Sequence, residues 1–133
     1  MIRKQYLISD TPYRMEGFAS ERFTEWKIDE YTYVELTKNG YHIITRRNDH
    51  LFTTKINPAI IGNMRKKATA TSKIRYYIPL TSILDAKVDI NAQDSQDKLI
   101  NVDFNSIEEA DNFSAPSWFG TEIVPKSKTK IKS

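Results

Sequence analysis

Basic and polar side chains recur at every second position in several segments of this chain, as in Lys73-x-Arg75. This spacing places them on one face of an extended strand. Arg and Lys together suit phosphate groups, because Arg forms a bidentate fork and Lys is a compact point charge. The predicted ligand-binding residues are Arg3, Gln5, Arg46, Thr53, Lys55, Lys73, Arg75, Tyr77, Asn101 and Asp103. Among them, Tyr77 is the candidate for stacking against a base.

The pattern has two interpretations. An antiparallel sheet commonly has one charged face in water, and such a face needs no ligand. A curled sheet would instead gather the bases on its concave face, where like charges are costly unless water or an anion compensates them. The acids are expected mostly in turns, in a helix and near the termini, so this face would have almost no carboxylates. The alternation alone does not choose between the two.

The segments with these residues are expected to be strands, since apolar residues alternate with the polar ones. Asn39-Gly40 predicts a tight hairpin, because both turn positions favour a positive φ. Asn48-Asp49 predicts the next turn, which completes a three-stranded meander. The expected strands cover residues 2–8, 33–36, 41–47, 51–56, 73–80, 86–90 and 99–104.

Helices and loops are expected between these strands. Ser106 and Glu109 form a capping box, which predicts a short helix that ends near Phe113. A second short helix is expected between residues 12 and 26. Residues 63–72, which include Arg65-Lys66-Lys67, are expected to form an exposed polar loop.

The order of the motifs resembles the CYTH domains, which are the triphosphate tunnel metalloenzymes. The matching segments are Tyr33–Tyr41, Thr45–Arg47, Phe52–Lys55, Lys73–Pro79, Val102–Ala110 and the closing Pro116-Ser-Trp-Phe-Gly-Thr-Glu-Ile123. The resemblance implies a mainly β chain of the α+β class, with an eight-stranded antiparallel barrel and a few short helices. It also implies a tunnel in which basic side chains bind a triphosphate and glutamates hold a divalent metal. The expected organisation is one barrel domain over residues 1–125 and a Lys-rich flexible tail over residues 126–133.

Several of the family's site residues are replaced in this chain, so the resemblance is to a degenerate member. Its first-strand Glu-x-Glu-x-Lys appears as Met1, Arg3 and Gln5, and its paired arginines appear as Ile44 and Arg46. Its Thr-x-Lys is kept as Thr53 and Lys55. Its Arg-x-Glu-x-Glu appears as Lys73, Arg75 and Tyr77, and its Glu-x-Glu appears as Asn101 and Asp103. The phosphate-binding bases are thus partly kept, and most metal-binding carboxylates are lost.

This pattern predicts a non-catalytic binder of a phosphorylated small molecule, either a nucleotide or a cyclic oligonucleotide signal, that acts as a receptor or a sequestering sponge. No catalytic residue and no cofactor are expected. Asp103 is a weak candidate for a metal ligand, because a single carboxylate makes a poor metal site. The first alternative is a metal-dependent triphosphatase or adenylate cyclase that uses Mg²⁺ or Mn²⁺ with Asp103 and Glu35 or Asp89. The second is a nucleic-acid- or protein-binding barrel that uses the Arg65 loop and the tail.

Composition narrows the class of protein. The chain has 133 residues and a net charge of only +3, from 20 basic and 17 acidic residues, which excludes a histone-like protein. Cysteine is absent, so disulfides and thiolate metal sites are excluded. There is no signal-peptide pattern and no apolar run of membrane-spanning length. A cytoplasmic protein without membrane contact is therefore expected, and the sequence leaves its oligomeric state open.

Overall fold

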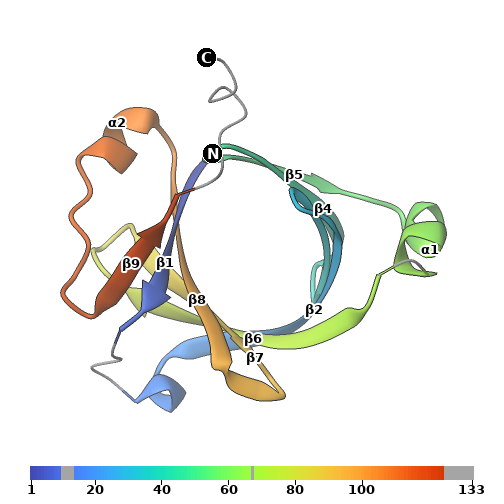
Figure 1. Ribbon diagram of the computed structural model, residues 1–133, viewed down its shortest axis with the longest axis horizontal. Helices are drawn as coiled ribbons and strands as arrows, with labels where there is room; N and C mark the ends of the chain where they lie inside the picture. Colours follow the sequence, from blue (N-terminus) through green and yellow to red (C-terminus); the bar gives the residue numbers. More distant parts are fainter. Residues whose placement is uncertain (10–13, 67, 125–133) are drawn as a thin grey trace.

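The computed structural model describes residues 1–9, 14–66 and 68–124. Antiparallel strands form a sheet in the order β5-β4-β3-β2-β6-β7-β8-β1-β9. The sheet closes on itself where Ile2 of β1 pairs with His50 of β5, which makes an eight-stranded barrel with β9 as an extra strand along β1 (Figure 1). The strands are β1 (Ile2–Ile8), β2 (Ala19–Asp29), β3 (Thr32–Thr37), β4 (Gly40–Arg47), β5 (His50–Lys55), β6 (Ala70–Pro79), β7 (Asp85–Asn91), β8 (Asp94–Phe104) and β9 (Phe119–Ile123).

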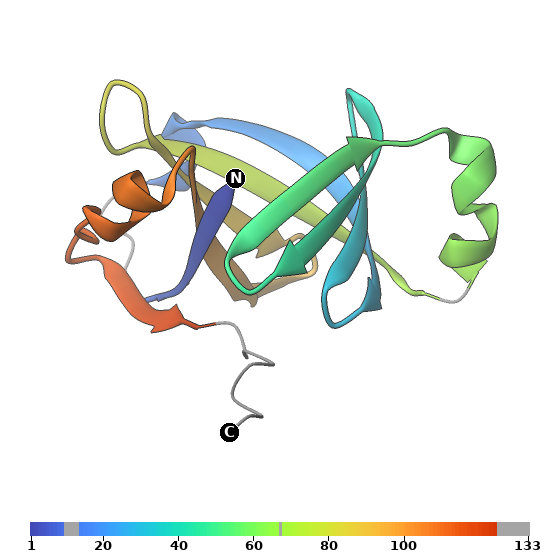
Figure 2. The same cartoon turned by 90° about the horizontal axis from the view of Figure 1, so that it is seen from above.

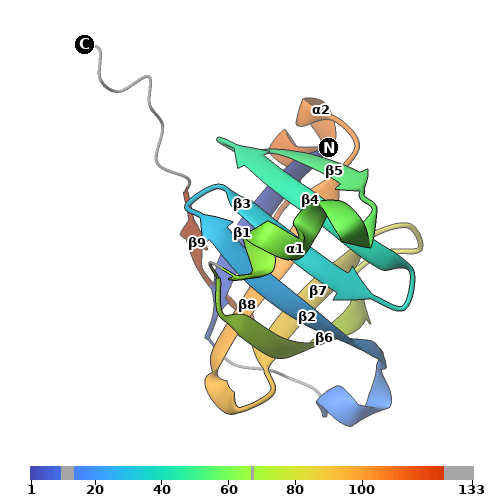
Figure 3. The same ribbon diagram turned by 90° about the vertical axis from the view of Figure 1, so that its right-hand side faces the viewer.

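The apolar side chains lie mainly on the outside of the barrel, in two clusters. One cluster covers strands β1, β6, β7 and β8 beneath β9 and helix α2 (Ile107–Asp111), and it includes Tyr6, Val88 and Phe119. The other joins Trp26 and Val34 to Ile61 of helix α1 (Pro58–Lys66). Figure 2 shows α1 at one end of the molecule and α2 with β9 at the other, and Figure 3 shows α1 across the outer face of the barrel. Because strands alternate their faces, this arrangement turns the polar residues inward.

Both turns form where they were predicted, but Asn39 does not have the positive φ expected beside Gly40, which instead pairs with Thr37. Gly40 has a φ of 106° at the β3–β4 hairpin, and Asn48 has a φ of 55° between β4 and β5. Both values lie in the region that L-residues with a bulky side chain avoid, and Gly and Asn tolerate it best. These turns fix the register that places His42 opposite Glu35 and Lys55.

The helix expected between residues 12 and 26 is wrong. In the described part of that segment, only Met15–Gly17 is helical, as a single 3-10 turn (η1), and β2 begins at Ala19. Phe23 and Trp26 are spaced like neighbours on one helix face, but in the strand they point to opposite sides. Phe23 packs inside the barrel under Arg75, and Trp26 packs outside with Val34.

The loop expected over residues 63–72 is also corrected, since α1 extends to Lys66 and β6 begins at Ala70. Pro58 starts the helix at a position where its missing N–H costs nothing, and the fully buried Ile61 fixes the helix to the barrel. Lys67 and the expected tail at 126–133 lie outside the described residues.

The capping box is confirmed at the start of α2. The Ser106 hydroxyl accepts a hydrogen bond from the Glu109 amide at 3.1 Å, and the Glu109 carboxylate accepts one from the Asn105 amide at 3.2 Å. The helix ends at Asp111, slightly before the predicted end, because Phe113 turns back to pack on Phe104.

No helix in the described ranges combines the length and the hydropathy needed to cross a bilayer.

Candidate functional site

The inside of the barrel is a polar, largely ion-paired interior. Side chains from all eight strands of the barrel line one small cavity there, among them Arg3, Arg46, Lys73 and Asn101. The predicted residue Gln5 also lines it, and Arg75 and Asp103 join these residues through hydrogen bonds to Asp89 and Arg3, whereas Tyr77 bonds to Glu21. Thr53 and Lys55 share the inward parity of β5 but remain exposed.

Arg75 lies at the centre of this interior between two carboxylates. Its Nε and Nη2 donate to Asp89 at 2.7 and 2.9 Å, and its Nη1 and Nη2 donate to Glu35 at 3.4 and 3.1 Å. The guanidinium also lies 4.3 Å above the centre of the Phe23 ring. Burial by itself lowers the pKa of Arg75. The two carboxylates raise the pKa by more than burial lowers it, so the net shift is upward. The charge of Arg75 is thus fully compensated within the protein.

A second network joins Arg3, Asp103 and Lys87. Arg3 binds both Asp103 oxygens, through Nε at 2.7 Å and Nη2 at 2.9 Å, and Lys87 Nζ donates to Oδ2 at 2.9 Å. Burial tends to raise the pKa of Asp103, but the two cations outweigh it and hold the pKa well below its usual range. Asp103 is therefore ionised at neutral pH.

Two further contacts complete the interior. Lys73 Nζ donates to Glu25 at 2.8 Å in a partly buried ion pair. The Tyr77 hydroxyl donates to Glu21, and burial together with this bond raises the pKa of Tyr77 to about 12. This bond ties down the hydroxyl of the residue that the sequence suggested for base stacking.

The expectation that the inner face has almost no carboxylates is wrong. Strand β2 supplies Glu21 and Glu25, β3 supplies Glu35, and β7 supplies Asp89. The first two were missed because their segment was expected to be partly helical. For the other two the signal was present, since Glu35 lies between Val34 and Leu36, and Asp89 lies between Val88 and Ile90.

Arg46 differs from the other interior bases because its partners are neutral. Its Nε donates to the Asn48 carbonyl at 3.0 Å, its Nη2 to the Arg3 carbonyl at 3.2 Å, and its Nη1 to the side chain of Gln5. Among the described residues it forms no ion pair. Burial lowers the pKa of Arg46, and the nearby Arg3 lowers it further, while Asp49 and Asp103 oppose the shift from beyond ion-pair distance.

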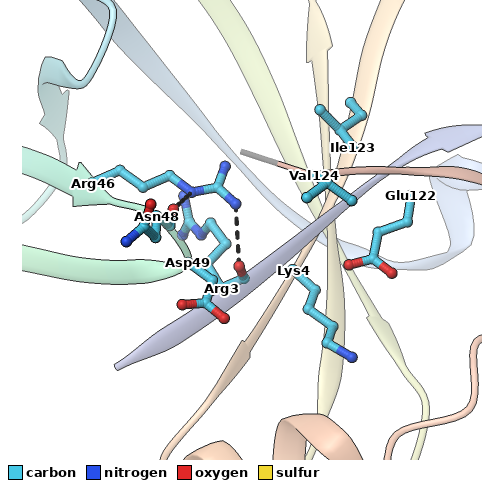
Figure 4. Close-up of a pocket in the computed structure, with 8 residues that line it drawn as sticks. All are labelled: Arg3, Lys4, Arg46, Asn48, Asp49, Glu122, Ile123 and Val124. Atoms are coloured by element: carbon cyan, nitrogen blue, oxygen red, sulfur yellow. Dashed lines mark hydrogen bonds between the residues drawn. The ribbon is translucent and has the colours of Figure 1, made fainter. Parts of the chain in front are cut away.

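Two cavities lie beside these residues, and they differ in volume. The cavity inside the barrel has a volume of about 80 Å³. A second cavity of about 300 Å³, which we call the mouth, opens beside Arg46 (Figure 4). It is lined by Arg3, Lys4, Arg46, Asn48, Asp49, Glu122, Ile123 and Val124. Small-molecule pockets typically have volumes of about 300–1,000 Å³, so the mouth reaches this range and the interior does not.

The mouth passes beside strand β1, between the β4–β5 turn and the end of β9. Arg3 and Lys4 are neighbours on β1 and point to opposite faces of it. Figure 4 shows Arg46 on the side of Arg3, and Glu122 on the side of Lys4. Gln5, which donates to Asn101 at 2.8 Å, holds Arg46 in place from the interior.

The carboxylates of the barrel do not fit a divalent metal. Asp103, Asp89 and Glu35 each have both oxygens bound by cationic donors. Glu21 keeps one buried oxygen without a partner, but a magnesium or manganese site needs several oxygen ligands that converge. Within the described ranges, no group of three or more His, Asp or Glu side chains could hold a metal ion.

Comparison of the fold defines its class. The chain has the closed eight-stranded antiparallel barrel of the CYTH-like fold. It is similar to the crystal structure of the inorganic triphosphatase NE1496, with a TM-score of 0.57, 17% identity, and coverage of 98% of this chain and 92% of that one. A second crystal structure, described as the hypothetical protein NE1496, gives a TM-score of 0.57 and 18% identity over 96% and 91% of the two chains.

Sequence comparison adds no family: no family model matches this chain, and no curated protein matches it.

Proposed function

We propose that this protein binds a phosphorylated small molecule, a nucleotide or a cyclic oligonucleotide, at the mouth and does not hydrolyse it. Such a protein would act as a receptor or as a sponge that sequesters a signalling nucleotide. The observation that supports the proposal most is Arg46, a partly buried guanidinium with neutral partners beside a cavity of about 300 Å³. A buried charge without a counterion is costly, and a bound phosphate would remove that cost.

The interior of the barrel is a poor place for the ligand. Arg3, Lys73 and Arg75 already bind carboxylates, so an incoming phosphate would have to displace Asp103, Glu25, or Glu35 and Asp89. A displaced Glu35 or Asp89 would remain buried without its cation, which is strongly unfavourable. The small interior volume supports the same conclusion.

Binding without turnover follows from the same ion pairs. Hydrolysis of a phosphoanhydride in a tunnel of this kind relies on a metal to polarise the phosphoryl group and to activate water. Asp103 is bound by Arg3 and Lys87, and Asp89 is bound by Arg75. A metal would have to displace these cationic side chains before either carboxylate could ligate it. The second candidate function is a metal-dependent triphosphatase, which the likeness to a structure described as an inorganic triphosphatase favours.

Calorimetry tests the binding proposal. Adenosine and guanosine monophosphates, triphosphates and cyclic dinucleotides are titrated into the protein in buffer with EDTA. At least one should bind, and Arg46→Ala should weaken that binding by roughly 10- to 100-fold, as expected for loss of a charge-assisted contact. Arg47→Ala is the matched control, because Arg47 is the exposed neighbour on the outer face of β4. Absence of binding to the whole panel, or equal affinity in Arg46→Ala, would contradict the proposal.

A phosphate-release assay separates the two candidates. With inorganic triphosphate or ATP and Mg²⁺ or Mn²⁺, we expect no release above the uncatalysed rate. Release that is abolished in Asp103→Asn would establish the triphosphatase instead.

A further inference from the structure

The charges at the mouth nearly cancel, and this limits the anion that it can accept. The cations that line it are Arg3, Lys4 and Arg46, and the acids are Asp49 and Glu122. These residues give the lining a net charge of +1, and Asp103, the partner of Arg3, is itself shared with Lys87. The excess is therefore a single positive charge, and Arg46 and Lys4 are the lining cations that form no ion pair with the described residues.

A phosphodiester matches this excess, and a polyphosphate does not. A diester has one negative charge per phosphate, whereas a triphosphate brings several negative charges into one place. Asp49 and Glu122 line the same cavity and would repel those additional negative charges. Arg46 can receive a single diester phosphate, because a guanidinium has more N–H donors than its bonds to Asn48, Arg3 and Gln5 use.

The rest of the lining suits the neutral part of a nucleotide. The carboxylates of Asp49 and Glu122 can accept hydrogen bonds from sugar hydroxyls or base N–H groups. Ile123 and Val124 offer apolar contact, and Val124 is 69% exposed. An inorganic polyphosphate has no N–H group and no apolar surface, so it would use neither feature.

We propose that the mouth selects a nucleoside phosphodiester, such as a cyclic nucleotide, over nucleoside triphosphates and inorganic triphosphate. This inference rests on the proposed function and names the class of ligand for the same site. In it, Arg46 supplies the charge, and Asp49 and Glu122 act as the specificity-determining residues that reject further negative charge.

The test is a set of binding titrations in EDTA with four probes: cyclic AMP, cyclic di-AMP, ATP and inorganic triphosphate. A diester probe should bind roughly tenfold or more tightly than either polyphosphate. The double variant Asp49→Asn with Glu122→Gln should increase the affinity for the polyphosphates more than that for the diester, because it removes two negative charges but no positive one. Arg46→Lys should keep part of the diester affinity that Arg46→Ala loses, and thermal melting verifies that each variant is folded.

The outcomes separate the inference from the function on which it rests. Absence of binding by both diester probes would overturn the inference, and absence of binding by the whole panel named above would overturn the proposed function as well. Arg46-dependent binding that is tightest for ATP or inorganic triphosphate would overturn the selectivity and leave the proposed function intact. An unchanged ratio of affinities in the double variant would overturn the role of Asp49 and Glu122.

Discussion

Arg75 and Arg46 have the same side chain, but their surroundings give them different tasks. Arg75 lies between Glu35 and Asp89 and has a structural role, because its single positive charge is neutralised by carboxylates within the barrel. Arg46 donates to a side-chain amide and two backbone carbonyls and keeps its charge available. A count of basic residues on the inner face therefore overstates the capacity for anions.

The buried pair of Arg75 and Asp89 gives the first prediction at this scale. Asp89→Ala should lower the free energy of unfolding by about 3–5 kcal/mol, because it leaves a buried cation with one partner fewer. Asp85→Ala on the same strand is the control, since Asp85 is exposed, and it should cost less than about 0.5 kcal/mol. Urea unfolding at pH 7 measures both, and equal costs would contradict the assignment of Arg75 and Asp89 as a structural pair.

Asp103 gives a prediction for pH. Its pKa in the folded protein lies below the usual value of about 3.9, because Arg3 and Lys87 outweigh the effect of burial. A depressed pKa contributes stability above the unfolded-state pKa, and this contribution is lost as the pH falls through the folded-state pKa. Wild type should thus be more stable than Asp103→Asn at pH 7, and the difference should shrink progressively below about pH 4. Urea unfolding of both proteins from pH 7 to pH 2 measures this, and a constant difference would contradict the ion pair.

The barrel has polar side chains inside and apolar side chains outside, and the elements packed on its outer surface cover the apolar side chains. Helix α1 covers Trp26 and Val34, and β9 with α2 covers the face that includes Tyr6 and Val88. Without these covers, the apolar outer faces of the strands would lie in water. Much of the hydrophobic stabilisation therefore comes from packing against the outside of the barrel.

Two adjacent residues of α1 test this at the scale of the element. Ile61 is fully buried against the barrel, whereas Ile60 is 65% exposed. Ile61→Ala should cost about 2–5 kcal/mol from lost contacts and the cavity that remains. Ile60→Ala should cost less than about 0.5 kcal/mol in the same thermal or urea unfolding experiment. Similar losses for both would show that α1 does not pack as described.

Two glycines give a second pair. A Cβ at Gly120 would lie 2.8 Å from the Leu7 carbonyl oxygen, so Gly120→Ala should push β9 away from β1 and cost about 1–3 kcal/mol. A Cβ at Gly62 would meet no atom within 4 Å, so Gly62→Ala within α1 should stabilise the protein by about 0.5–1 kcal/mol. The two substitutions should change the free energy of unfolding in opposite directions. Destabilisation by both would contradict the packing of α1.

The sequence predicted the strands and the faces of their residues more fully than it predicted which side chains form ion pairs. Alternation in the segments with Arg3, Arg75 and Asp103 assigned these residues correctly to the polar inner side, and the two turns fixed the central meander. The strand β2 was missed because Phe23 and Trp26 have helical spacing, and only pairing with β3 and β6 makes this segment extended. Arg75 and Glu35 lie 40 positions apart, so the ion pair that neutralises the tunnel depends on tertiary contacts that a local pattern does not contain.

At the scale of the whole molecule, the fold resembles that of a triphosphatase, whereas the ion-paired interior does not favour phosphate binding inside the barrel. The barrel is similar to a structure described as an inorganic triphosphatase, but here the bases of the tunnel hold carboxylates of the same chain. A phosphate would have to compete with these carboxylates for Arg3, Lys73 and Arg75. The barrel thus has a largely charge-balanced interior, and within the described residues Arg46 at the mouth is a guanidinium without an ion pair.

The position of a bound phosphate tests this account most directly. A crystal structure of the protein with a nucleotide or cyclic nucleotide from the binding panel would locate the phosphorus atoms by their density. We predict a phosphate at the mouth, within hydrogen-bond distance of Arg46, with the Arg3–Asp103 and Arg75–Asp89 pairs intact. A phosphate inside the barrel on Arg75 and Lys73, with Glu35 and Asp89 displaced, would contradict it.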